Sequence, residues 1–136
     1  MKNRLVLASN LPRRKELLRG LGIDFEVRLI GDIDESYPND LPTNEVPVHI
    51  SKAKAAAYMG TMTENEVILT ADTVVVCDGE ILGKPHDAED ARRMLGLLSG
   101  KSHEVITGVT LSTLQWQHSF AAEIFQTTFF AAVGFV

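Results

Sequence analysis

Apolar and polar positions along the chain repeat with two periods, one typical of strands and the other of helices. Five segments have either a continuous apolar run or a two-residue alternation, and these are residues 5–7, 25–29, 67–71, 74–82 and 104–114. Both patterns predict β-strands, fully buried in the first case and buried on one face in the second. In the fourth segment Asp78 and Gly79 stand between two apolar runs, which predicts a hairpin with a two-residue turn.

Three further segments begin and end with the signals of helices. The expected first and last signals are Ser9 or Asn10 and Gly20, Thr43 and Gly60, and Asp87 and Gly100. Short polar side chains cap the first turn of a helix, and glycine commonly ends one. The resulting order of strand, helix, strand, helix, strand, hairpin, helix and strand predicts an α/β domain with a mixed sheet and flanking helices.

The length and charge of the chain narrow the classes of protein to which it can belong. Its 136 residues, 45% of them hydrophobic, are enough for one domain with a core. The formal net charge of −5 argues against binding to a nucleic acid polymer, which needs a basic face. Cys77 stands alone, so no internal disulfide is expected. With no signal peptide and no apolar stretch long enough to cross a bilayer, we expect a cytoplasmic protein without a membrane partner.

A cluster of cations lies at the start of the first expected helix. Pro12 suits the first turn, and Arg13, Arg14 and Lys15 follow it. A helix N-terminus favours anions, so cations there oppose the helix dipole and do little for stability. They are useful if a phosphate lies between the free backbone N–H groups and the guanidinium groups. The spacing alone is equally compatible with a solvated basic patch that binds nothing.

Carboxylates follow two of the expected strands. Asp72 comes directly after residues 67–71, at the end of a strand where open α/β sheets place their ligands. It can be a metal ligand, a general base or a turn residue, and by position alone the turn residue is the most common case. Asp32, Asp34 and Glu35 lie in a loop after an earlier strand. Together these oxygens suit Mg²⁺, although the acidic run by itself is better explained as a solvated surface loop.

Two lysines are the remaining candidates for contacts with an anion. Lys54 lies among alanines on the second expected helix, where it can also be an ordinary solvent-facing residue. Lys84 lies between Gly83 and Pro85, in a rigid turn that suits a fixed point charge. Cations from separate segments, a helix end that binds anions and clustered carboxylates are the components that phosphoryl or nucleotidyl chemistry requires.

Several short motifs occur in the order and at the spacing of a known family. They are Leu7-Ala-Ser9, Pro12-Arg-Arg14, Glu16-Leu-Leu18, Asp34-Glu35, Lys54-Ala55, Ala71-Asp-Thr-Val-Val75, Gly83-Lys-Pro85, Leu98-Ser-Gly100, His103 and Thr107-Gly-Val109. With these motifs the chain resembles the Maf nucleotide pyrophosphatases from about residue 4 to about residue 112. The resemblance implies an elongated, strongly twisted α/β fold of the Maf and inosine triphosphatase type, with a cleft across its middle.

The resemblance also implies an activity and a set of site residues. Family members use a divalent cation, Mg²⁺ or alternatively Mn²⁺, to split a nucleoside triphosphate into a monophosphate and pyrophosphate. Carried over to this chain, Asp72 is the proton acceptor for the attacking water and, with Glu35, a metal ligand. The residues that contact the substrate are Ser9, Arg13, Arg14, Lys54 and Lys84, and the two lysines also act in catalysis. Arg13 and Thr73 match the branch that acts on dTTP and UTP.

The resemblance stops near Glu123, and the remaining residues have a different composition. Residues 124–136 include four of the six phenylalanines and no charged residue. We expect a Maf-like domain at residues 1–123 that lacks its C-terminal part through truncation or a frameshift, followed by an atypical apolar tail at 124–136. The tail can form one more core strand or pair with a second copy to give a homodimer. The alternative to an active enzyme is a catalytically inactive fragment that binds nucleotides or associates with itself.

Overall fold

The computed structural model describes residues 3–83 and 85–127, with residues 122–127 described through their backbone alone. The strands are β1 (Arg4–Leu7), β2 (Phe25–Val27), β3 (Glu66–Cys77), β4 (Glu80–Leu82), β5 (Ser102–Ser112) and β6 (Gln117–Thr127). The helices are α1 (Pro12–Gly20), α2 (Val46–Tyr58) and α3 (Ala88–Leu98), and short 3₁₀ turns precede and follow α2 at Thr43–Glu45 and Met59–Thr61. Within the described part of the chain, no helix is both long and apolar enough to cross a membrane.

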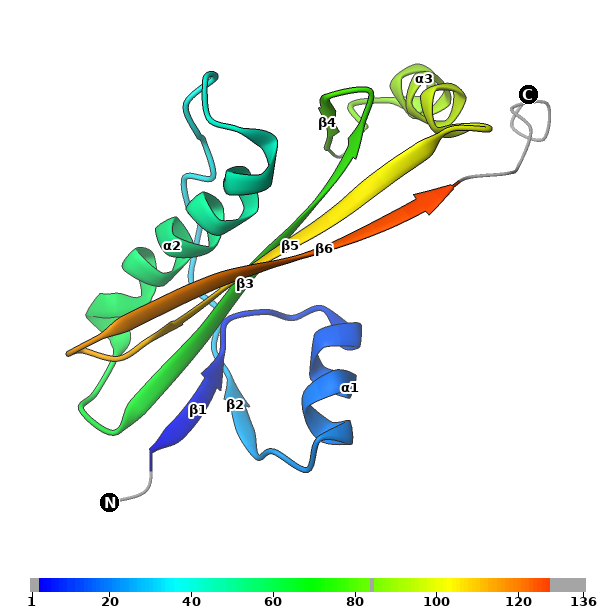
Figure 1. The fold of residues 1–136 in the computed structure, drawn as a ribbon. Helices are drawn as coiled ribbons and strands as arrows, with labels where there is room; N and C mark the ends of the chain where they lie inside the picture. The colour runs from blue at the N-terminus through cyan, green and yellow to red at the C-terminus, as the bar shows by residue number, and fades with distance from the viewer. Residues whose placement is uncertain (1–2, 84, 128–136) are drawn as a thin grey trace.

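The six strands form one mixed sheet. Their order is β2-β1-β3-β5-β6, with β4 pairing to β3 beside this path. The strand β1 is parallel to β2 and β3, whereas β4 and β5 are antiparallel to β3, and β6 is antiparallel to β5. Figure 1 shows that the sheet is strongly twisted and that α2 and α1 lie on opposite sides of it. The predicted α/β fold with a mixed sheet and flanking helices is therefore confirmed.

The strand β3 corrects one detail of the sequence prediction. Residues 67–71 and 74–76 were expected to be separate strands with Asp72 after the first, but they form one continuous strand. Each residue from Ile68 to Val76 pairs with β5, and Asp72 lies opposite Gly108. This long antiparallel pairing carries the backbone through the polar pair Asp72-Thr73, which interrupts the apolar pattern of the sequence. Asp72 therefore lies inside a strand and not in a turn.

The opposite edge of β3 changes its partner halfway along the strand. Its first part pairs with β1 as far as Leu69, and its last part pairs with β4 from Val75 onward. Among the described residues, no strand pairs with this edge at positions 70–74. Because the backbone groups of this interval have no strand partner there, they are open to side chains from other elements. Asp72 lies in the middle of this gap.

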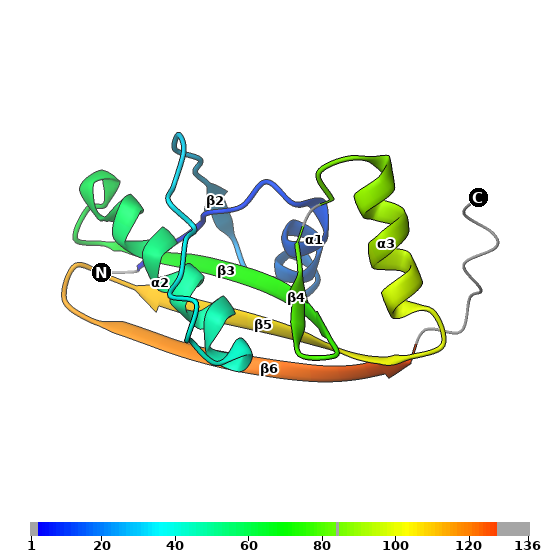
Figure 2. The same cartoon turned by 90° about the horizontal axis from the view of Figure 1, so that it is seen from above.

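Two of the three expected helices, α1 and α2, do not begin at the capping residue that the sequence predicts. No side chain caps α1, since Ser9 Oγ accepts from the Leu11 backbone N–H at 3.2 Å and Asn10 Oδ1 accepts from Lys15 Nζ at 2.6 Å. The 3₁₀ turn that begins at Thr43 delays the start of α2 to Val46. The predicted cap of α3 is confirmed, because the Asp87 carboxylate accepts from the Asp90 backbone N–H at 2.7 Å. Figure 2 shows α3 beside β4, well apart from α2.

The helix α2 packs on one face of the sheet through two apolar clusters. The first comprises Val46, Ile50, Val74, Val76 and Ile106, and the second comprises Val6, Tyr58, Met62 and Ile68. Between the clusters a chain of hydroxyl groups joins the helix to the sheet. Ser51 Oγ lies 2.6 Å from Thr110 Oγ1, and Thr70 Oγ1 donates to the Ser51 carbonyl at 2.7 Å. These hydrogen bonds satisfy polar groups that would otherwise be costly to bury.

Gly108 sets how closely α2 can approach the sheet. A Cβ atom built on Gly108 would lie 2.4 Å from the Pro47 carbonyl carbon and 2.4 Å from the Val48 backbone nitrogen. The first turn of α2 therefore lies directly over the backbone of β5, at a distance that only glycine allows. Since Gly108 is also opposite Asp72, this close approach fixes the height of α2 above the centre of the sheet.

An ion cluster around the buried Glu66 carboxylate, which the sequence pattern did not reveal, ties β3 to β1 and to the segment after β2. The Glu66 carboxylate is 1% exposed and lies 2.5 Å from Arg28 Nη2 and 3.0 Å from Arg4 Nη2. It also accepts from the Thr63 backbone N–H at 3.0 Å. The hydrogen bonds from Arg28, more than any other influence, lower the pKa of Glu66 to about 2. The cluster favours the ionised carboxylate and with it the folded state.

This cluster predicts a loss of stability in acid. The folded-state pKa of Glu66 is depressed below its ordinary value of 4.5, so its contribution is complete above that value and is lost as the pH falls toward about 2. Hydrogen bonds between charged partners of this kind contribute about 1.5–3 kcal/mol. Urea unfolding between pH 5 and pH 2 should show a shallower loss in Glu66→Gln than in the wild type, with the exposed Glu64→Gln as control. Equal slopes in all three proteins would contradict this prediction.

Candidate active site

Asp72 lies at the gap in the edge of β3, on the face of the sheet that α2 covers. Side chains alternate along a strand, so Thr70, Asp72 and Val74 face α2 while Ala71 and Thr73 face the side of α1. The Asp72 side chain is 18% exposed. Burial raises the pKa of its carboxyl above the ordinary value, and the nearby Lys54 ammonium partly opposes this effect. A partly buried carboxylate of this kind is suited to accepting a proton.

Lys54 projects from α2 toward the same gap. Its ammonium lies 3.4 Å from Asp72 Oδ1 and donates to the Ala71 carbonyl at 3.1 Å. It also lies 3.1 Å from Glu35 Oε1. The neighbouring residues Ser51 and Ala55 are buried against the sheet, which sets the rotation of the helix and places Lys54 at the edge of its buried face. Of the two alternatives that the sequence allows for Lys54, the structure excludes an ordinary solvent-facing lysine.

Glu35 reaches this place from the long loop between β2 and α2. Ile30 and Ile33, two loop residues before it, pack against the second apolar cluster, and this contact holds the loop beside the C-terminal part of α2. Of the three acidic residues considered in this loop, Glu35 alone joins the ion pairs of the site. Asp34 instead accepts from the Ser36 backbone N–H at 2.9 Å, and hydrogen bonding by the Ser36 side chain and then by its backbone lowers the pKa of Asp34. Asp32 is exposed.

These residues line a hollow of about 600 Å³, which we call the acidic hollow. Its lining residues are Leu11, Arg14, Glu35, Tyr37, Ile50, Lys54, Asp72, Thr73, Val74, Ile81, Leu82 and Gly83. It lies where α1, α2 and the β3–β4 hairpin meet the gap in β3. Lys84, the other predicted lysine, lies outside the described residues.

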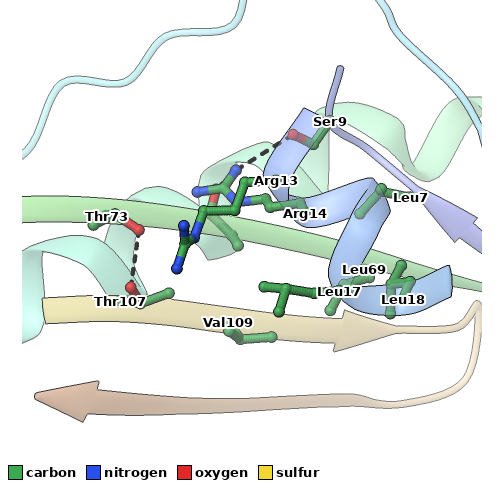
Figure 3. A pocket seen from close by; sticks show the side chains of 11 residues that line it. Leu7, Ser9, Arg13, Arg14, Leu17, Leu18, Leu69, Thr73, Thr107 and Val109 are labelled. Atoms are coloured by element: carbon green, nitrogen blue, oxygen red, sulfur yellow. Dashed lines mark hydrogen bonds between the residues drawn. The ribbon is translucent and has the colours of Figure 1, made fainter. Parts of the chain in front are cut away.

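A second hollow of about 300 Å³, which we call the apolar hollow, lies on the other face of the sheet beneath α1. Its walls are mostly aliphatic, with Leu7, Leu17, Leu18, Leu69 and Val109 among the lining residues. One polar feature lies on its floor, where Thr73 Oγ1 and Thr107 Oγ1 are 2.9 Å apart. Figure 3 shows the Arg13 guanidinium directed toward these two hydroxyl groups. An apolar space with a few polar groups at one end suits a flat ring with hydrogen-bonding edges.

Arg14 and Thr73 line both hollows and so join them. The Arg14 guanidinium lies 3.5 Å from Ser9 Oγ and 3.4 Å from the Ala71 carbonyl, and Figure 3 shows its bond to Ser9. Burial lowers the pKa of Arg14, while the charge on Asp72 acts in the opposite direction. Arg14 is thus a fixed cation at the junction. Through Arg14, the cation cluster at the start of α1 contacts Ser9 and the Ala71 carbonyl, so it is more than a solvated basic patch.

The carboxylates at the junction suit a divalent cation that takes its other ligands from water and from the substrate. Glu35 and Asp72 are two carboxylates that share one ammonium, and in the described residues no group of three or more His, Cys, Asp or Glu side chains lies together. A site with two carboxylates is too sparse to enclose a metal ion alone. It matches the preference of Mg²⁺ for one or two carboxylates together with water and substrate phosphates.

The structure also brings in residues that the sequence had not assigned to the site. Thr107 meets Thr73 across β3 and β5, Tyr37 lines the acidic hollow, and the Ala71 carbonyl accepts from both Lys54 and Arg14. The pairing of the two threonines follows from the strand register, which places residue 73 opposite residue 107. A register assignment for the β3–β5 pair could have found it, whereas no sequence signal marks a backbone carbonyl.

Comparison with known proteins places these residues in a family. A family model described as Maf-like protein matches residues 4–133. A dTTP/UTP pyrophosphatase of Phocaeicola vulgatus is 55% identical over 121 residues, which cover 89% of this chain and 63% of that protein. A dTTP/UTP pyrophosphatase of Vibrio vulnificus is 44% identical over 117 residues, covering 86% of this chain and 62% of that protein. The chain spans less than two thirds of the length of these relatives.

Solved structures share the fold at low sequence identity. The Staphylococcus aureus Ham1 protein matches with a TM-score of 0.63 and 14% identity, covering 90% of this chain and 70% of that chain. A HAM1 protein from Coxiella burnetii matches with a TM-score of 0.57 and 14% identity, covering 90% of this chain and 71% of that chain. At this level of identity the likeness concerns the fold alone, and it agrees with the twisted α/β architecture expected from the motifs.

Proposed function

The chain belongs to the family of Maf-like proteins, and we propose that it hydrolyses nucleoside triphosphates to the monophosphate and pyrophosphate. The relatives that bear the name dTTP/UTP pyrophosphatase support dTTP and UTP as its substrates. The observation that carries the proposal is the junction of the two hollows, where a partly buried carboxylate, two cations and a second carboxylate lie beside an apolar space. An inactive fragment is the less favoured alternative, because these residues all lie within the chain.

In the proposed mechanism the two hollows divide the substrate between them. The apolar hollow takes the base, and the junction takes the triphosphate, held by Arg14 at the start of α1 and by the lysines. Asp72 accepts a proton from a water molecule directed at the α-phosphorus. Lys54 and Lys84 offset the negative charge of the triphosphate and of the leaving pyrophosphate. A protein that only bound triphosphates would need the same cations but no base at this position.

We propose Glu35 and Asp72 as the protein ligands of a divalent cation, with Mg²⁺ as the resident ion and Mn²⁺ as the alternative. When bound, this ion would neutralise phosphate oxygens and lower the cost of charge on the leaving group. A cytoplasmic location and a homodimer formed through the last part of the chain also belong to the proposal. So does the division into a domain at residues 1–123 and a tail at 124–136, although β6 runs through that boundary to Thr127.

The apolar hollow predicts a preference for pyrimidine bases. Arg13 and the Thr73–Thr107 pair offer hydrogen-bond donors and acceptors at the end of a small apolar space. Pyrophosphate release from UTP and dTTP should be faster than from ATP and GTP, as measured with Mg²⁺ and identified by chromatography of the monophosphate. Thr73→Val and Arg13→Ala should each reduce the ratio of kcat/KM for pyrimidine and purine substrates about tenfold, through loss of a hydrogen bond to the base.

Arg19→Ala is the matched control for the arginine variant. Arg19 lies in the last turn of the same helix, where its guanidinium is 5.8 Å from the centre of the Phe25 ring and away from both hollows. This variant should keep the wild-type ratio. Equal rates with all four bases in the wild type would mean that the apolar hollow does not select the base. Release of inorganic phosphate in place of pyrophosphate would contradict the proposed reaction.

A further inference from the structure

The Lys54 ammonium makes two hydrogen bonds and a further ion pair, all with the protein itself. An ammonium group has three N–H donors. Three oxygen atoms from three different segments lie around Nζ, namely the Ala71 carbonyl at 3.1 Å, Glu35 Oε1 at 3.1 Å and Asp72 Oδ1 at 3.4 Å. The lysine side chain is only 19% exposed. A phosphate oxygen that binds Lys54 must therefore compete with these three partners for the ammonium.

Two of these three oxygens belong to the carboxylates that would hold the divalent cation. We propose that Lys54 is a resident counter-ion of the Glu35–Asp72 pair, which must leave the two carboxylates before they can bind a divalent cation and is thereby freed to bind phosphate. This inference rests on the proposed function, and it adds an exchange between a lysine and a metal ion at the same pair of carboxylates. Metal binding and phosphate binding are then coupled through one side chain.

Electrostatics explains why the exchange is needed. Like charges repel, so Glu35 and Asp72 need a cation between them, most of all because Asp72 is largely buried. In the nucleotide-free protein Lys54 supplies that cation from a fixed position on α2. A divalent ion that approached the same oxygens would meet the ammonium at short range, and this repulsion would weaken its binding. Removing the ammonium therefore removes a competitor and leaves the carboxylates available.

The structure provides a matched control in Lys52, two residues earlier on the same helix. Lys52 is exposed and lines a different groove, beside Leu41, His49 and Ala121. A methionine at either position removes one positive charge from α2 and changes the net charge of the protein equally. Only the substitution at position 54 frees the two carboxylates. Lys54→Gln is a second variant, because glutamine keeps hydrogen-bond donors for the neighbouring oxygens without the positive charge.

The experiment measures binding of Mn²⁺ alone to the nucleotide-free protein, from the electron paramagnetic resonance signal of the free ion. We expect Lys54→Met and Lys54→Gln to bind Mn²⁺ about tenfold more tightly than the wild type, and Lys52→Met to bind like the wild type. Glu35→Gln added to Lys54→Met should abolish the gain. Thermal unfolding of each variant shows which of them are folded, and the comparison uses the folded ones.

Three outcomes would overturn the inference. They are unchanged or weaker Mn²⁺ binding in the Lys54 variants, an equal gain in Lys52→Met, and a gain that persists without Glu35. Pyrophosphate release by the wild type with Mg²⁺ is measured separately and tests the proposed function. Tighter Mn²⁺ binding in a chain that releases no pyrophosphate would support the exchange and contradict the function. Release of pyrophosphate without the gain in Mn²⁺ binding would support the proposed function and contradict the exchange.

Discussion

Substitution of Asp72 by asparagine should lower kcat for pyrophosphate release by about a thousandfold, because the amide cannot accept a proton from water. The substitution keeps the size of the side chain and removes the only carboxylate that faces the junction from β3. Burial already raises the pKa of Asp72, so a neutral amide is tolerated at this depth. The fold should therefore survive while the chemistry is lost. Pyrophosphate release at saturating UTP, with thermal unfolding beside it, checks both expectations.

Asp78→Asn is the control for this variant. Asp78 lies in the β3–β4 turn with a φ of 53°, a conformation that asparagine adopts readily, and its ion pair with Lys101 is exposed. Its activity should equal that of the wild type. If Asp72→Asn kept more than a tenth of the wild-type rate, Asp72 would not be the base. If its thermal midpoint collapsed, the lost activity would report on folding and not on proton transfer.

The second large effect concerns stability, and it is expected from Gly108→Ala. The new methyl group would lie 2.4 Å from backbone atoms of Pro47 and Val48, and backbone cannot move aside as a side chain can. The whole first turn of α2 would have to rise from the sheet and open the cluster around Val46 and Ile106. We expect a loss of roughly 3 kcal/mol or more in the free energy of unfolding. Urea unfolding measures this directly.

Gly96→Ala is the matched control for the glycine substitution. Gly96 lies inside α3, and a Cβ atom there would meet nothing within 4 Å. Alanine favours a helix interior over glycine by up to about 1 kcal/mol, so this variant should be slightly more stable than the wild type. A loss of less than about 1 kcal/mol in Gly108→Ala would show that α2 does not depend on the close approach.

Local signals predicted much of the fold. The apolar runs correctly predicted the positions of β1, β2 and β5, and the Asp87 cap correctly predicted the start of α3. Both signals depend only on residues that are close together in the sequence. Pairing over long distances determined the rest. The polar residues Asp72 and Thr73 interrupt the apolar pattern of β3, and only the pairing with β5 makes the strand continuous. The strand β6 was not foreseen before residue 124, since Gln117–Glu123 has no clear two-residue alternation.

The candidate site was predictable as a set of residues but not as an arrangement. The motifs named Ser9, Arg14, Glu35, Lys54 and Asp72, and the structure brings all five to the junction of the two hollows. Their division between two faces of the sheet was not visible, because it depends on where β1 ends and β4 begins along the edge of β3. The contact of Lys54 with both carboxylates depends in turn on the height of α2 above Gly108.

In the proposed mechanism Asp72 directs water to the α-phosphorus of a pyrimidine nucleoside triphosphate. Hydrolysis of UTP in ¹⁸O-labelled water tests it most directly, with the position of the label read by mass spectrometry. Attack at the α-phosphorus predicts one labelled oxygen in UMP and unlabelled pyrophosphate, with both products formed about a thousandfold more slowly in Asp72→Asn. Label in pyrophosphate, or UDP with labelled phosphate, would contradict this mechanism, since the water would then have attacked a different phosphorus.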